Sequence, residues 1–170
     1  GIVGEDSQLY QLSTSPVSAA MGRPAVTAGG QLVLFVDTAG NLKSVEIASF
    51  QESTVLDSGV IRTIAGSHDG RYFAWTTTAQ DNKIYLADLA DETGNSNKTF
   101  ELYWPTDADL QSNSVEYAEV MNFDLTNSLI VYDALSEVTL QGVTDGNPQF
   151  WSIGILDITS GAISAFVPSQ

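Results

Sequence analysis

The sequence contains no cysteine, which excludes a disulfide framework, a thiolate metal site and a cysteine nucleophile. Its one histidine, His68, has no second imidazole to join it in a metal site, and no nucleophile-elbow motif accompanies the serines. No apolar run approaches the roughly 18 residues that a membrane-spanning helix needs. We therefore expect neither membrane insertion nor a catalytic centre within this chain.

Basic residues are scarce. Six Lys and Arg stand against 21 Asp and Glu, for a formal net charge of −15. The last base is Lys98, so residues 99–170 carry ten acids and no base. A surface this negative repels phosphate backbones and anionic lipid headgroups. We expect no nucleic-acid partner and favour cations or a basic protein.

The chain of 170 residues, 43% of them hydrophobic, is long enough for one domain with its own core. Short alternating runs are broken every eight to twelve residues or so by Gly, Asn, Asp, Ser or Pro, a pattern typical of an all-β protein. No stretch has the period of a long amphipathic helix. The chain begins at Gly1 rather than methionine. We expect a processed form or a piece of a longer protein.

One unit is especially clear. Ser67, His68, Asp69 and Gly70 form a predicted turn, in which glycine supplies a positive φ and aspartate bonds its own backbone. Two predicted strands follow, over residues 71–76 and 83–89. Weaker copies of the unit recur on either side. Gly30 of the preceding copy falls forty residues before Gly70, a period typical of the four-stranded blades of a β-propeller.

The sequence therefore predicts a β-propeller of four-stranded antiparallel blades. It divides into a partial blade over residues 1–22 and complete blades over residues 23–59, 60–113 and 114–170. We expect residues 7–14 to form the third strand of the partial blade. The strands of the complete blades are expected over residues 25–28, 31–36, 41–47, 53–56, 60–65, 71–76, 83–89, 99–104, 117–123, 129–134, 150–158 and 162–167. Because closed propellers have four to eight blades, we expect part of a larger propeller, or a homo-oligomer.

The segment SHDGRYFAW, followed by NKIYLADL, resembles the repeat of TolB-like β-propellers, also called WD40-like or PD40 repeats. His68 stands where that repeat usually has proline. The repeat occurs once in good form and twice in degraded form. The resemblance implies a non-catalytic scaffold that binds a protein or other ligand through rim loops or a central channel, in the bacterial periplasm or outside the cell.

The sequence also resembles two other families of propeller proteins. The same repeats resemble the propeller domains of prolyl-oligopeptidase-type peptidases, whose catalytic residues would lie in a separate domain. Residues 6–12 suggest propellers of the quinoprotein or outer-membrane-assembly kind, although regularly spaced tryptophan docking motifs are absent.

Two long connections, residues 105–112 and 134–149, are expected on one rim, where binding residues commonly lie. The candidate binding residues there are Asp107, Asp109, Asp133, Glu137, Asp145 and Asn147. Four of these offer oxygen ligands to calcium: Asp107, Asp109, Glu137 and Asp145. The alternative is an ordinary solvated rim, because Leu110 stands where a calcium loop would place a further ligand. No other cofactor is expected, and Asp133 is either a buried functional carboxylate or a cap of the loop backbone.

Overall fold

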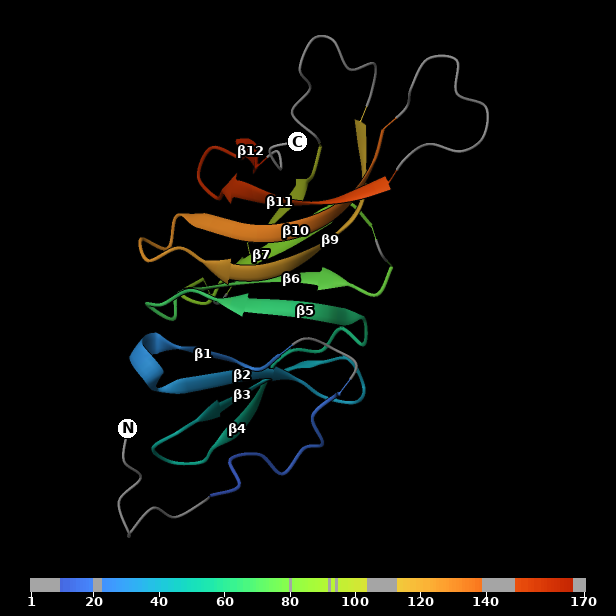
Figure 1. Cartoon of the computed structure of the whole chain (residues 1–170). Coiled ribbons are helices and arrows are strands. Elements are labelled where there is room, and N and C mark those ends of the chain that lie inside the picture. The colour runs from blue at the N-terminus through green and yellow to red at the C-terminus, as the bar shows by residue number, and fades with distance from the viewer. Residues whose placement is uncertain are drawn as a thin grey trace, which may run out of the picture.

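The structure is a computed structural model that describes residues 10–19, 23–79, 81–91, 93, 95–103, 113–138 and 149–166. These residues form three four-stranded sheets, each of antiparallel strands in chain order (Figure 1). The predicted all-β fold with blade-like sheets is confirmed. None of the described helical residues makes a helix long and apolar enough to cross a membrane.

We call the three sheets blades one, two and three. Blade one contains β1 (Ala25–Thr27), β2 (Leu32–Val36), β3 (Leu42–Glu46) and β4 (Glu52–Leu56), with the 3-10 turn η1 (Ala28–Gly30) after β1. Blade two contains β5 (Ile61–Gly66), β6 (Tyr72–Thr77), β7 (Lys83–Asp88) and β8 (Lys98–Glu101). Blade three contains β9 (Asn113–Phe123), β10 (Leu129–Val138), β11 (Gln149–Asp157) and β12 (Ile163–Phe166).

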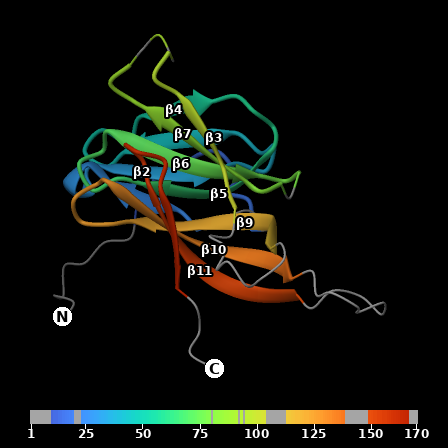
Figure 2. The same cartoon turned by 90° about the horizontal axis from the view of Figure 1, so that it is seen from above.

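The inner strands β1, β5 and β9 lie next to one another, and the blades fan out from them. Figure 2 shows β9, β10 and β11 following one another away from β5. This arrangement matches the predicted propeller geometry, in which the first strand of each blade lies nearest the common axis.

Blade two is packed on both of its faces. One face meets blade one in a core that includes Leu34, Leu42 and Trp75. The other meets blade three in a core that includes Leu86 and Ile130. Burial of such side chains stabilises the fold by about 1.5–3 kcal/mol each relative to an exposed position.

The first turns of the three blades are joined across one rim. The Gly29 N–H donates to the His68 carbonyl at 3.1 Å, and the His68 N–H donates to Asn127 Oδ1 at 2.7 Å. Within the turn itself, Ser67 Oγ and the Arg71 N–H both donate to Asp69 Oδ1, and Gly70 adopts a φ of 76°. The predicted turn at residues 67–70 therefore links its blade to both neighbours.

Two expectations need correction. Residues 10–14 form no strand, and Val17 makes only an isolated bridge to Asp37, so the strand predicted over residues 7–14 is wrong for its described part. The connection predicted over residues 134–149 is shorter, because β10 continues to Val138 and pairs Leu135 with Trp151. Apolar cross-strand pairs extend this ladder beyond the point where sequence alternation suggested a loop.

Candidate functional site

Of the predicted rim residues, Asp107, Asp109, Asp145 and Asn147 lie outside the described residues. The strand ends that flank the two connections lie together, because Glu137 pairs with Gln149 and Val138 pairs with Asn113. Within the described ranges, no group of three or more His, Asp or Glu side chains could hold a metal ion. Calcium binding at this rim stays a prediction.

Asp133 and Glu137 both lie on β10. Gln149 Nε2 donates to Glu137 Oε2 at 3.5 Å. Asp133 lies in the middle of the strand rather than at its end, and its Oδ1 atom is buried with no hydrogen-bond partner. Burial raises the pKa of the Asp133 carboxyl, and the neighbouring Glu119 carboxylate raises it further. Asp133 therefore does not cap the loop backbone through Oδ1.

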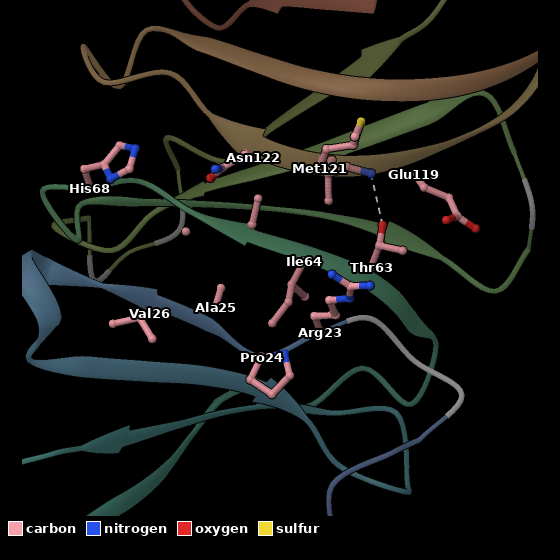
Figure 3. Close-up of a pocket in the computed structure, with 13 residues that line it drawn as sticks. Arg23, Pro24, Ala25, Val26, Thr63, Ile64, His68, Glu119, Met121 and Asn122 are labelled. Atoms are coloured by element: carbon pink, nitrogen blue, oxygen red, sulfur yellow. Dashed lines mark hydrogen bonds between the residues drawn. The ribbon is translucent and has the colours of Figure 1, made fainter. Parts of the chain in front are cut away.

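A pocket of about 560 Å³ lies along the three inner strands, and we call it the inner-strand pocket (Figure 3). Each of β1, β5 and β9 is the edge strand of its sheet, so one side of each backbone has no strand partner. Figure 3 shows His68 at one end of the pocket, with Arg23 and Glu119 toward the other. The lining residues on which the argument depends are Arg23, Val26, Thr63, His68, Glu119 and Met121.

Of the two charged side chains that line the pocket, Glu119 has an ion-pair partner and Arg23 has none among the described residues. Arg62 of β5 forms an ion pair with Glu119 of β9, and its guanidinium lies 5.2 Å from the centre of the Tyr117 ring. Arg23 is exposed, and its guanidinium has no hydrogen bond or ion pair with the described part of the chain. Among these described residues, the pocket thus offers one free cation beside an acid that is already paired.

The pocket also exposes apolar side chains. Val26 is 61% exposed and Met121 is 54% exposed. In the same pocket, Thr63 Oγ1 accepts a hydrogen bond from the Val120 N–H at 3.1 Å and lies 2.6 Å from Thr76 Oγ1, so it ties blade two to blade three. Exposed apolar groups on rigid strands, next to polar groups with fixed positions, are typical of binding surfaces.

Sequence reasoning identified the inner strands and singled out His68 as a turn residue, but it did not identify the pocket. Arg23 gave a signal, as a rare base two residues before the first strand of a blade. Val26 and Met121 gave none, because an exposed apolar residue on a strand is indistinguishable in sequence from a buried one. The pocket forms only where three strands distant in sequence become neighbours.

Comparisons with known proteins give little beyond the fold. No protein-family model and no curated protein matches the sequence. Among solved structures, the chain is similar to dihydro-heme d1 dehydrogenase NirN in complex with DHE, at 16% sequence identity and a TM-score of 0.45. The alignment covers 93% of this chain and 38% of that protein. The fold assignment rests on the three sheets themselves, and nothing of that protein's chemistry is carried over.

Proposed function

We propose that this chain is a non-catalytic, TolB-like propeller scaffold that binds an extended segment of a partner protein in the inner-strand pocket. The observation that carries the proposal is the convergence of three edge strands on one pocket with exposed Val26 and Met121. An extended peptide can satisfy the free backbone groups of an edge strand while its side chains occupy apolar sites.

The charges of the pocket suggest how such a segment is oriented. The guanidinium of Arg23, which has no partner among the described residues, favours a carboxylate of the segment, since arginine binds carboxylates in a bidentate manner. Outside the pocket, the net charge of −15 favours a partner whose remaining surface is basic. The repeat at residues 67–89 supports a scaffold of the bacterial envelope or extracellular space.

Selection from a random linear-peptide library on the immobilised full chain tests this function. We expect the selected peptides to bind the unchanged chain and to lose at least about tenfold in affinity with Val26→Glu or Met121→Glu, because buried anchors dominate such interfaces.

The matched control is Leu125→Glu, which introduces the same charge at a residue that is 85% exposed and lies outside the pocket. Leu125→Glu should leave binding unchanged. Failure to select any peptide, or peptides that bind all three variants equally, would rule out the pocket as the binding site.

A further inference from the structure

The two faces of blade three differ. One face carries Val120, Tyr132 and Leu156 and packs against blade two. The other, which we call the outward face, carries the side chains that alternate with them. Its cross-strand rows are Glu119–Asp133–Ile153 and Tyr117–Leu135–Trp151, with Val131 and Ile155 beside them.

The outward face is apolar and accessible. Trp151 is 50% exposed and Ile153 is 45% exposed. The Trp151 and Tyr117 rings meet edge to face with their centres 5.4 Å apart, so the aromatic part of the face is already ordered. A contiguous apolar sheet face of this kind marks an interaction surface.

In blade one, the face that points away from blade two is buried. Phe35 and Val45 lie on the face opposite blade two, yet they are only 2% and 1% exposed. Residues 10–19 run past this blade and are held there by the Val17–Asp37 bridge and by stacking of Tyr10 on Phe50. In the described part of the chain, one end of the three-blade stack is thus covered by residues 10–19, whereas Trp151 and Ile153 at the other end are exposed.

A carboxylate lies in the middle of the open face. Asp133 Oδ1 is buried without a hydrogen-bond partner. Arg62, whose charge acts on Asp133, forms its ion pair with Glu119 instead, and no Lys or Arg occurs after Lys98. An apolar partner that covered Asp133 without neutralising it would leave an uncompensated buried charge, which is strongly unfavourable.

The contact between blades two and three shows which groups meet an apolar face with acidic or carbonyl acceptors in this fold. There the apolar faces meet, while two bases of blade two reach across to acceptors of blade three. Arg62 pairs with Glu119, and Lys98 Nζ donates to the Ile158 carbonyl at 2.8 Å. A second copy of this chain cannot supply the same complement through the same face, because every strand of blade three lies after Lys98 and so offers no Lys or Arg to Asp133.

We propose that the outward face of blade three docks a β-sheet of a partner protein, whose apolar face presents one Arg or Lys to Asp133. This surface shares Glu119 with the inner-strand pocket. The two tests use different residues, Asp133 and Ile153 here and Val26 and Met121 there, so either proposal can fail its test without the other.

A library of disulfide-closed β-hairpin peptides tests this docking surface on the full chain. Each hairpin has one apolar face whose central position is randomised. We expect the unchanged chain to enrich Arg and Lys at that position at least about tenfold over Glu. Asp133→Asn should abolish this preference, whereas Glu101→Gln, which removes the same charge from the exposed edge of blade two, should keep it.

Two further variants define the surface. Ile153→Lys changes an exposed residue, so the chain should fold, and it should lose hairpin binding because lysine adds charge to the face and pairs with Asp133. Val26→Glu, in the inner-strand pocket, should leave hairpin binding intact. The proposal is overturned if hairpins show no preference for a base, if Asp133→Asn keeps that preference, or if the chain sediments as a dimer that Ile153→Lys dissociates.

Discussion

Gly70 of blade two lies so close to Ala28 of blade one that a β-carbon at position 70 would be 2.5 Å from the Ala28 Cβ. Gly70 also adopts a φ of 76°, which L side chains rarely adopt. The glycine of the repeat turn therefore serves both its own backbone and the contact between two blades.

Gly70→Ala should lower the free energy of unfolding by about 2–4 kcal/mol, the sum of backbone strain and overpacking. Gly30→Ala is the matched control, because Gly30 has a φ of 91° but a β-carbon added there would have nothing within 4 Å. Gly30→Ala should lower the free energy of unfolding by only about 1 kcal/mol, from backbone strain alone. Urea denaturation measures both, and equal losses would show that the inter-blade contact is unimportant.

Gly154 and Tyr132 form a second close pair, directly opposite each other on β11 and β10. A β-carbon at Gly154 would be 2.2 Å from Tyr132 Cζ. Burial raises the pKa of the Tyr132 hydroxyl to about 12, in keeping with a ring that is enclosed on blade three's packed face.

Gly154→Ala should lower the free energy of unfolding by about 1–3 kcal/mol, because the enclosed Tyr132 ring must shift. In a Tyr132→Ala background the same change should cost nothing, or stabilise by up to about 1 kcal/mol, since alanine is favoured over glycine within a strand. A double-mutant cycle in urea provides the measurement. An unchanged cost in the Tyr132→Ala background would locate the strain elsewhere.

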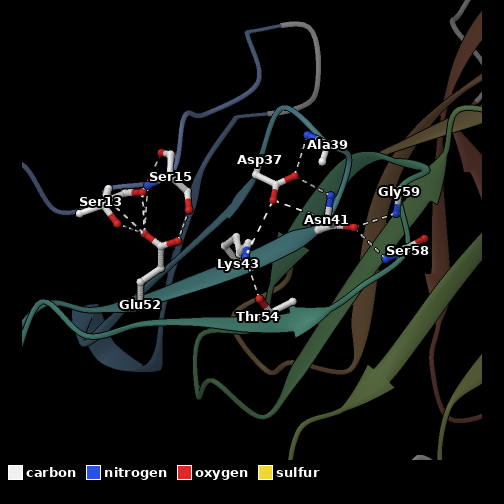
Figure 4. Close-up of polar contacts among 11 residues, drawn as sticks. Ser13, Ser15, Asp37, Ala39, Asn41, Lys43, Glu52, Thr54, Ser58 and Gly59 are labelled. Atoms are coloured by element: carbon white, nitrogen blue, oxygen red, sulfur yellow. Dashed lines mark hydrogen bonds and ion pairs between the residues drawn. The ribbon is translucent and has the colours of Figure 1, made fainter.

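Glu52 holds residues 13–15 against blade one (Figure 4). Its carboxylate accepts hydrogen bonds from the Ser13 hydroxyl at 2.9 Å and the Thr14 N–H at 3.1 Å, and from Ser15. The Ser15 side-chain hydrogen bond is the main cause that lowers the Glu52 pKa from 4.5 to about 2, and the other donors add to it. The stabilisation that this carboxylate contributes is present above about pH 4.5 and is lost as the pH falls through about 2.

Glu52→Gln should therefore release residues 13–18 without unfolding the blades. Amide hydrogen exchange at Thr14, Ser15 and Ser18 should become about tenfold faster at neutral pH, while that of β5 and β6 stays unchanged. Glu101→Gln controls for the loss of one negative charge. Unaltered exchange at these three amides would mean that other contacts hold the segment.

For Asp133 we expect the opposite dependence of stability on pH. Its pKa is raised in the folded chain, so between 3.8, the ordinary value, and the raised value the folded state binds more protons than the unfolded state. Stability attributable to this group therefore falls as the pH rises through that window. Glu119 and Arg62 are the charged groups that face it, and both remain in the variant.

Asp133→Asn should raise the free energy of unfolding at neutral pH by up to about 1 kcal/mol, after allowance for solvent screening. The difference from the unchanged chain should shrink as the pH falls toward 3.8. Urea denaturation at a series of pH values measures it, and acids shared by both chains cancel in the comparison. A variant that is less stable at every pH would show that the carboxylate is satisfied in the folded chain.

Sequence reasoning succeeded where structure is local. The turn at residues 67–70 follows from Asp69 and Gly70, whose roles need only the adjacent backbone. Local chemistry also repeats where the third strands of blades two and three end, because Asp88 and Asp157 each accept a hydrogen bond from the N–H two residues further on, at Ala90 and Thr159. The failures involve partners distant in sequence, such as residues 10–14, which alternate like a strand but lie against blade one without joining it.

The sequence by itself thus determined most strands and turns of the three blades and their order, because alternation and turn chemistry act over a few residues. Only the tertiary structure decided which face of each blade is buried, since alternation defines two faces without saying which one meets a neighbour. It also brought Arg23, Val26 and Met121 into one pocket and left the buried Asp133 Oδ1 atom without a hydrogen-bond partner. Those features depend on contacts between sheets, and no spacing within the chain encodes them.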